Sequence, residues 1–127
     1  MFSAKCIMKT SYTFENLIVW QKAHSFVLKI YKLTSTFPVE EKYGLTNQFR
    51  RAVVSIAANI VEGHKKTGKK DKLRFFNISQ GSIEECKYFL ILLRDLSYSV
   101  NPKKEEKQII EVSMLLTAYS NKIYKSL

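Results

Sequence analysis

Residues 45–61 read LTNQFRRAVVSIAANIV and decide the fold class. Apolar side chains recur here at steps of three and four, which places them on one face of an α-helix, opposite the charged and amide side chains. The apolar face consists of Leu45, Phe49, Ala52, Val53, Ile56, Ala57, Ile60 and Val61. The helix is expected to end near Gly63. Its apolar face needs other elements to cover it.

The same spacing occurs in three further stretches. A helix is expected from Leu17 to the Phe37-Pro38 pair, because proline disfavours the helical conformation in the residue before it. Another is expected over about 69–97, and a last one after Asn101-Pro102, a capping residue followed by proline at the first helical position. The main stripe of the 69–97 helix is predicted to be Phe75, Ile78, Ser82, Cys86, Phe89, Leu93 and Leu96.

Four helices and no alternating strand pattern predict an all-α fold. Short connections make consecutive helices antiparallel, so we expect an up-down-up-down four-helix bundle. Only 4 Gly and 2 Pro occur, too few for the many turns of a β-sandwich. A chain of 127 residues is typical of one domain, which we place at 14–127 after a flexible N-terminal tail over residues 1–13.

The composition is that of a basic globular protein. There are 21 Lys and Arg against 11 Asp and Glu, a net charge of +10, which favours an acidic partner such as nucleic acid. Cys6 and Cys86 are far apart and form no disulfide framework, so we expect a reducing cytoplasm. No stretch has the apolar run of a signal peptide or a membrane span. Either Met1 or Met8 could be the translation start.

One segment of the sequence resembles the phosphate-binding loop of nucleotide-binding enzymes. Gly63 to Lys70 matches the phosphate-binding pattern G-x-x-x-x-G-K, but Lys70 replaces the hydroxyl residue that binds magnesium, and a helix precedes it where that motif needs a strand. His24 and His64 have no partners at metal-ligand spacing, and the adjacent Glu84 and Glu85 point about 100° apart on a helix. We therefore expect no enzyme activity, no metal and no cofactor.

The charge gathers in one segment. Residues 64–74 (HKKTGKKDKLR) hold half of the net charge in eleven positions. Lysines at a helix junction suit phosphate groups and carry little sequence preference. The candidate nucleic-acid contacts are Lys65, Lys66, Lys69, Lys70, Lys72 and Arg74, with Arg50 as an extension. A solvated basic loop without a ligand is the alternative, and the lack of interleaved aromatic residues weakens the case for base stacking.

Polar side chains also follow helical spacing on otherwise apolar faces. The set consists of Arg51, Asn59, Glu62, Gln80 and Glu84. Arg51 with Glu84, or Asn59 with Gln80, is expected to bridge two helices and set their register, because a buried charge needs a partner. Gly81 is unfavourable inside a helix, so we expect a neighbouring helix to approach it closely.

A third feature is the run Tyr88 to Leu93, which is apolar all round its helix. A bundle helix buries one stripe, and a contiguous apolar patch outside that stripe marks an interface. The predicted oligomer interface consists of Tyr88, Leu90, Ile91 and Leu92. Phe26 and Val54 similarly lie off the main predicted faces.

Three motifs resemble one known family. Residues 14–23 (FENLIVWQKA), residues 44–63, and Arg74-Phe75-Phe76 followed by residues 81–85 (GSIEE) are similar to the four-helix bundle proteins encoded in intervening sequences of bacterial 23S ribosomal RNA genes. The resemblance covers Phe14 to Tyr98, with Ala57 where that family commonly has proline. It implies a ring-like homopentamer, and a relation to the accessory proteins of diversity-generating retroelements, basic pentameric barrels that bind nucleic acid and a reverse transcriptase.

The sequence and the resemblance together predict a non-enzymatic oligomer that binds nucleic acid, either structured RNA or RNA/DNA, through its Lys-rich junction. A scaffold for a polymerase or another nucleic-acid enzyme is the alternative from a different class. An intervening-sequence passenger with little selected activity is a third.

Overall fold

A computed structural model describes residues 13–98 and 101–127, all of which are helical or in connections, with no strand among them. Two short 3-10 turns, η1 (Phe14–Asn16) and η2 (Val39–Glu41), accompany the long helices. These are α2 (Ile18–Thr34), α3 (Leu45–Lys65), α4 (Lys69–Asp95) and α5 (Lys103–Lys125). The four predicted helices and the all-α fold are confirmed. Residues 1–12, which include most of the predicted tail, Cys6 and Met8, lie outside the described residues.

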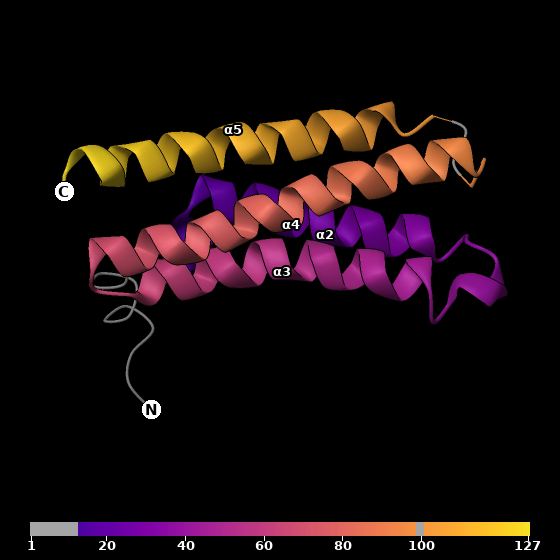
Figure 1. Cartoon of the computed structure of the whole chain (residues 1–127), viewed down its shortest axis with the longest axis horizontal. Coiled ribbons are helices and arrows are strands. Elements are labelled where there is room, and N and C mark those ends of the chain that lie inside the picture. Colours follow the sequence, from indigo (N-terminus) through magenta and orange to yellow (C-terminus); the bar gives the residue numbers. More distant parts are fainter. Residues whose placement is uncertain (1–12, 99–100) are drawn as a thin grey trace.

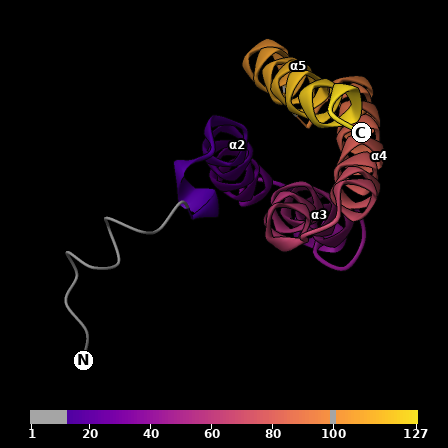
Figure 2. The same ribbon diagram turned by 90° about the vertical axis from the view of Figure 1, so that its left-hand side faces the viewer.

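The helices lie side by side around one core. Figure 1 shows the α2–α3 and α4–α5 connections at one end of the molecule and the α3–α4 turn at the other. The view along the helices places α3 between α2 and α4, and α4 between α3 and α5 (Figure 2). Ion pairs of Lys22 with Glu111 (3.6 Å) and Lys29 with Glu105 (3.9 Å) join α2 to α5. Each helix thus contacts two others.

The core is built from the apolar faces that the periodicity predicts, with three corrections. Phe26, predicted to lie off the main face of α2, is fully buried. In the first half of α4 the buried stripe is Phe76, Ser79 and Ile83, one residue later than predicted, and Ile78 is 43% exposed. Ser79 lies against α3, where its hydroxyl donates to the carbonyl oxygen of Ile56 at 2.9 Å. The buried position is therefore occupied by Ser79, a small residue with a hydrogen bond, and not by Ile78 as predicted.

The packing around two glycines, Gly63 and Gly81, differs from the prediction. Gly63 does not end α3, which continues to Lys65, and it is the buried site of close approach. A Cβ atom built there would lie 2.6 Å from Cε1 of Phe76 and 3.1 Å from Cβ of Phe75. A Cβ at Gly81 would meet no atom within 4 Å, so the close contact predicted there is wrong. Gly63 therefore allows the start of α4 to pack against the end of α3.

The end of α4 is fixed by a left-handed residue. Ser97 has φ 61°. The Tyr98 amide donates to the Leu93 carbonyl at 2.9 Å and the Ser97 amide to that of Arg94 at 3.2 Å, the Schellman pattern of helix ends. The Tyr98 ring lies 5.5 Å from that of Phe37, and its hydroxyl hydrogen bonds to Glu41 at 2.9 Å. The connection between α2 and α3 is thereby held against the end of α4.

Candidate nucleic-acid interface

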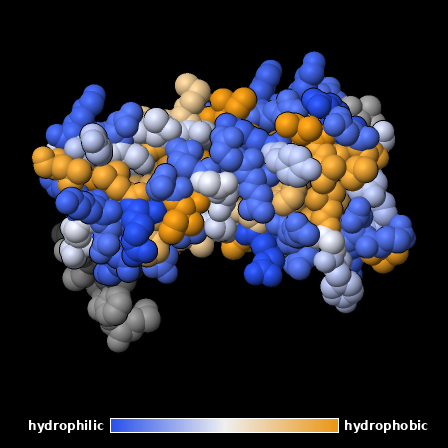
Figure 3. Space-filling model, in the orientation of Figure 1, coloured by the Kyte–Doolittle hydropathy of each residue, from blue (hydrophilic) through white to orange (hydrophobic). Residues whose placement is uncertain are grey.

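The basic segment is two helix ends joined by a three-residue turn, Lys66, Thr67 and Gly68. The expected loop over 63–70 is therefore shorter than predicted, because α3 and α4 extend into it. Lys65 ends α3, whereas Lys69, Lys70, Lys72 and Arg74 occupy the first two turns of α4. In Figure 3 hydrophilic residues lie at this end of the molecule, on the left of the view, above and below a hydrophobic band. The fold brings all six predicted cations of 64–74 to one end of the bundle.

Lys72 is the least available of these cations. Its ammonium donates to the carbonyl oxygens of Gly63 at 3.3 Å and His64 at 2.6 Å, and so adds hydrogen bonds to carbonyls in the last turn of α3. Partial burial lowers the pKa of Lys72 from its ordinary 10.5. Its charge also counters the negative end of the α3 dipole. Lys72 is thus a helix cap whose positive charge still adds to the field of this end.

Two further cations lie on the ring of Phe75. The Lys66 ammonium is 5.0 Å and the Arg74 guanidinium 4.6 Å from its centroid, a cation–π arrangement. Arg74 also forms an ion pair of 3.8 Å with Asp71, the only carboxylate among residues 64–74. An aromatic side chain therefore lies among the basic ones. The prediction overlooked this because it considered only the order of residues 64–74, and Phe75 is the next residue.

Sequence reasoning also missed the contribution of α5. The Lys69 ammonium donates to the Ser126 carbonyl at 2.7 Å, which places the last turn of α5 beside the start of α4. That turn carries Lys122 and Lys125. Residues 64–74 and 117–127 together hold eight Lys and Arg and one carboxylate side chain. The signal was available in the sequence, since the helix after residue 102 is long enough to return to this end.

Like Lys122 and Lys125 of α5, two cations of residues 64–74, Lys65 and Lys70, have no internal polar contact among the described residues. Both are exposed, and neither has a hydrogen-bond or ion-pair partner within the described part of the chain. An ammonium group in this state can contact a phosphate without first breaking an internal bond.

Arg50 lies away from this cluster. It is fifteen positions before Lys65 on α3, about 22 Å along the helix axis. Its Nε donates to Thr34 Oγ1 at 2.8 Å and its Nη2 to the Tyr31 carbonyl at 3.2 Å, with the guanidinium 4.6 Å from the Tyr31 ring. Arg50 therefore caps α2 at the opposite end of the bundle and does not extend the Lys-rich end.

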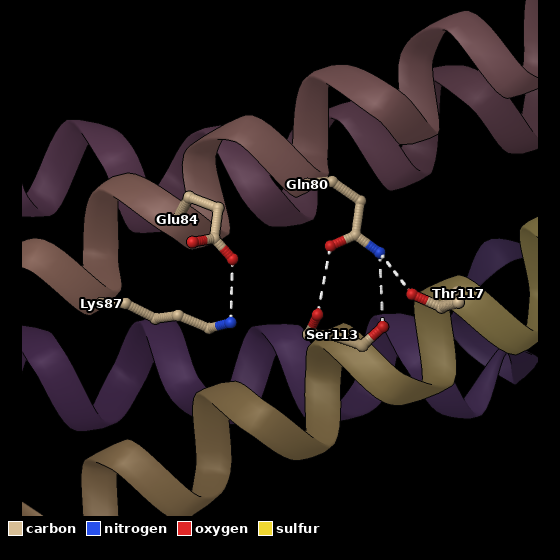
Figure 4. A network of polar contacts seen from close by, with 5 residues as sticks. All are labelled: Gln80, Glu84, Lys87, Ser113 and Thr117. Atoms are coloured by element: carbon tan, nitrogen blue, oxygen red, sulfur yellow. Dashed lines mark hydrogen bonds and ion pairs between the residues drawn. The ribbon is translucent and has the colours of Figure 1, made fainter.

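The predicted polar network forms with different partners. Gln80 bridges α4 to α5, donating to the Ser113 carbonyl (3.3 Å) and Thr117 Oγ1 (3.0 Å) and accepting from Ser113 Oγ (3.2 Å), as Figure 4 shows. Glu84 pairs with Lys87 on its own helix at 2.8 Å, while Arg51 is exposed, so the predicted Arg51–Glu84 bridge is wrong.

Polar contact between α3 and α4 comes from serines. Asn59 donates to the carbonyl and hydroxyl of Ser55 within α3 and does not reach Gln80. Glu62 is exposed and bridges no helices in the described structure. The Ser82 hydroxyl donates to that of Ser55 at 2.9 Å, so small hydroxyls join the two helices where amides were expected. Asn59 and Gln80 thus make their hydrogen bonds to Ser55 and to α5, respectively, and not to each other.

The predicted oligomer interface divides into buried and exposed parts. Leu90 is fully buried in the core, so its assignment to the interface is wrong. Its neighbours Tyr88 and Ile91 are 57% and 43% exposed, and Leu92 is half-buried. The hydrophobic area in the right half of Figure 3 lies over this C-terminal half of α4. An apolar run cannot by itself distinguish core from surface, whereas the four-helix arrangement does.

Among the described residues no group of His, Cys, Asp or Glu is placed to hold a metal ion. Residues 63–70, which resemble a phosphate-binding loop in sequence, form the end of α3, the turn and the start of α4, so a helix and not a strand precedes the turn. No helix in the described ranges is long and apolar enough to cross a membrane.

Comparison with known proteins gives a family match and a similar solved structure. Residues 15–118 match the family of 23S rRNA-intervening sequence proteins. The fold is similar to a crystal structure of a protein with unknown function from the S23 ribosomal protein family of Bacteroides thetaiotaomicron VPI-5482. The TM-score is 0.73 at 24% identity, over 81% of this chain and 98% of that one. No curated protein matches. Because the family match spans most of the chain, this protein belongs to the 23S rRNA-intervening sequence protein family.

Proposed function

We propose that this protein binds nucleic acid, without catalysing a reaction, through the Lys-rich end of its bundle. The observation that carries the proposal is the gathering of eight cations around a single carboxylate side chain where α3, α4 and α5 meet. Such a surface attracts phosphates and releases their counterions. RNA is the ligand proposed for the test.

Lys65 and Lys70, with Lys122 and Lys125 from α5, make the principal phosphate contacts in this proposal, because none of these side chains has a partner among the described residues. Lys66, Lys69 and Arg74 contribute while held by Phe75, Ser126 and Asp71 respectively. Lys72 stays in its capping position and contributes only long-range electrostatic attraction for phosphates. These contacts read the backbone and not the bases, so this end alone gives little sequence preference.

The test is fluorescence anisotropy with a structured RNA over a range of salt concentrations. The logarithm of the affinity should fall linearly with the logarithm of salt, by roughly 0.7–0.9 per phosphate contacted. The double variant Lys65→Glu/Lys70→Glu should lose about tenfold or more in affinity at moderate salt. A flat salt response in the wild type would overturn the proposal.

The matched control reverses two charges at the other end of the bundle. Lys103 and Lys104 are exposed in the first turn of α5, so Lys103→Glu/Lys104→Glu changes the net charge equally and suits the helix dipole there. This variant should keep most of the affinity. Equal losses in both variants would show that overall charge, and not the proposed end, sets binding.

We further propose that the up-down bundle assembles into a ring-like homo-oligomer, for which the family resemblance suggests five subunits. Exposed Tyr88 and Ile91 on α4, with Ile110 and Met114 on α5, support an interaction surface. A ring repeats the basic end and multiplies weak contacts through effective concentration. Light scattering should report an oligomer that Tyr88→Lys/Ile91→Asp dissociates; a stable wild-type monomer at micromolar concentration would contradict this.

The same exposed residues support the second candidate function, a scaffold on which a polymerase or another nucleic-acid enzyme docks. The two functions differ in their dependence on nucleic acid. Recovery of one protein partner after nuclease treatment, lost in Tyr88→Lys/Ile91→Asp but retained in Lys65→Glu/Lys70→Glu, would favour the scaffold.

A further inference from the structure

A groove lined by both polar and apolar groups lies between α4 and α5 at the Lys-rich end. It has a volume of about 550 Å³, within the range of sites for small organic groups. Its walls are two facing stripes at helical spacing, Arg74, Asn77 and Gln80 from α4 and Thr117, Asn121 and Tyr124 from α5. No carboxylate lines it. The groove therefore carries no negative charge, includes the cation of Arg74 and offers amide and hydroxyl groups for hydrogen bonding.

The far end of the groove is closed by fixed side chains. Gln80 is tied through both its oxygen and its nitrogen to Ser113 and Thr117, so it forms a rigid stop between the helices (Figure 4). Beyond it Glu84 and Lys87 form an ion pair of 2.8 Å in which the two charges offset each other. An anionic chain that enters from the Lys-rich end thus has its charges favoured at the mouth, and Gln80 limits how far it extends along the groove.

Two amides and one aromatic ring in the groove are not used by the fold. Asn77 and Asn121 are exposed, and neither has a hydrogen bond within the described residues. Tyr124 is 66% exposed. Amide side chains pair with the edges of bases, and an exposed aromatic ring stacks on their faces. These groups contact a nucleobase only when it is unpaired.

From this arrangement we propose that the α4–α5 groove binds an unpaired nucleobase of a single-stranded nucleic acid whose phosphates lie on the Lys-rich end. The inference rests on the proposed function and extends it from backbone contact to base contact. Tyr124 stacks on the base, and Asn77 and Asn121 hydrogen bond to its edge. Arg74, at the mouth, is held by Asp71 and Phe75 near the adjoining phosphate.

The experiment separates bases from phosphates. Anisotropy compares a mixed-sequence single-stranded RNA, the same DNA sequence, and an abasic oligomer with equal phosphates. The wild type should bind the base-containing strands roughly 5- to 150-fold more tightly than the abasic one, the range expected from one stacked base. Comparison of the RNA with the DNA identifies which strand supplies the base.

Variants then locate the base site. Tyr124→Ala and Asn77→Ala/Asn121→Ala should abolish the preference over the abasic oligomer while keeping its salt-dependent binding. Tyr124→Phe should keep the preference, because the ring remains. Tyr43→Ala and Asn47→Ala are matched controls at the opposite end of the bundle, where both residues are exposed. Circular dichroism checks that each variant is folded.

The outcomes distinguish the two proposals. Equal wild-type affinity for base-containing and abasic strands, both weakened by Lys65→Glu/Lys70→Glu, overturns the base site and leaves the phosphate surface standing. A preference that survives in Tyr124→Ala and Asn77→Ala/Asn121→Ala also overturns it. Absence of binding to every oligomer, at low salt, overturns the proposed function and the base site together.

Discussion

At the end of the bundle where α2 meets α3, Arg50 directs its guanidinium into the protein, to Thr34 Oγ1 at 2.8 Å and the Tyr31 carbonyl at 3.2 Å. At the other end Lys65 and Lys70 extend into solvent. The first end is further held by the hydrogen bond from Tyr98 to Glu41. The comparison teaches that a positive residue beside a helix end can serve the fold or a ligand, and that only its contacts tell which.

Capping connects the two ends. Arg50 from α3 caps α2, Lys72 from α4 caps α3, and Lys69 from α4 caps the end of α5. Each cation meets carbonyls of a different helix, where the dipole is negative. The net charge of +10 therefore includes several positions that stabilise the bundle, and the surplus at the Lys-rich end is what remains for a partner.

The largest effect is expected from Gly63→Ala at the Lys-rich end. The new Cβ would lie 2.6 Å from a ring carbon of Phe76, which is fully buried, so that the ring or the two helices must shift. We expect a loss of roughly 2–3 kcal/mol in the free energy of unfolding, typical of overpacking. Urea denaturation measures it.

Gly81→Ala is the matched control, since its Cβ meets no atom within 4 Å. It should stabilise the protein by about 1 kcal/mol through helix propensity. Opposite signs for the two substitutions would establish that close packing, and not glycine as such, matters at position 63. Destabilisation by both would contradict the described contact.

These two glycines also show how far sequence reasoning reaches. Periodicity located the four helices, because the apolar positions of α3, from Leu45 to Ile60, leave one face to bury. It could not tell that Gly63 lies inside a helix, since glycine ends helices as readily as it permits close contacts. The distinction depends on Phe76, from another helix, and is therefore tertiary.

The candidate site, like the fold, could be predicted from the sequence only in part. A local run of charge is visible in residues 64–74, but its completion by Lys122 and Lys125 requires knowing where α5 ends. Arg50 was misplaced although the spacing alone was informative, because fifteen positions along one predicted helix separate it from Lys65 by about 22 Å. Leu90 was misassigned because an all-apolar turn has no outward face until its neighbours are known.

A smaller effect is expected from Arg50→Ala. The substitution removes hydrogen bonds from a charged group to Thr34 and Tyr31, and the stacking on the Tyr31 ring. We expect the free energy of unfolding to fall by about 1–2 kcal/mol, reduced from a fully buried case because Arg50 is half-exposed. RNA affinity should stay within about twofold, given the distance of about 22 Å from Lys65. A loss as large as that of Lys65→Glu/Lys70→Glu would break the division between the two ends.

The smallest expected effect is on stability at alkaline pH, where the two ends of the bundle contribute in opposite directions. The hydrogen bond to Glu41 raises the pKa of Tyr98 above its ordinary 10.0, so the folded protein keeps a proton that the unfolded chain releases, and stability falls as pH rises past 10. Lys72 acts in the opposite direction: its pKa is lowered by burial, so stability rises as pH approaches 10.5. Tyr98→Phe should remove the alkaline loss and leave the gain, so the melting temperature of the variant should decline less than that of the wild type between pH 9 and 11. Identical slopes in the two proteins would show that the contact between Tyr98 and Glu41 does not hold this end together in solution.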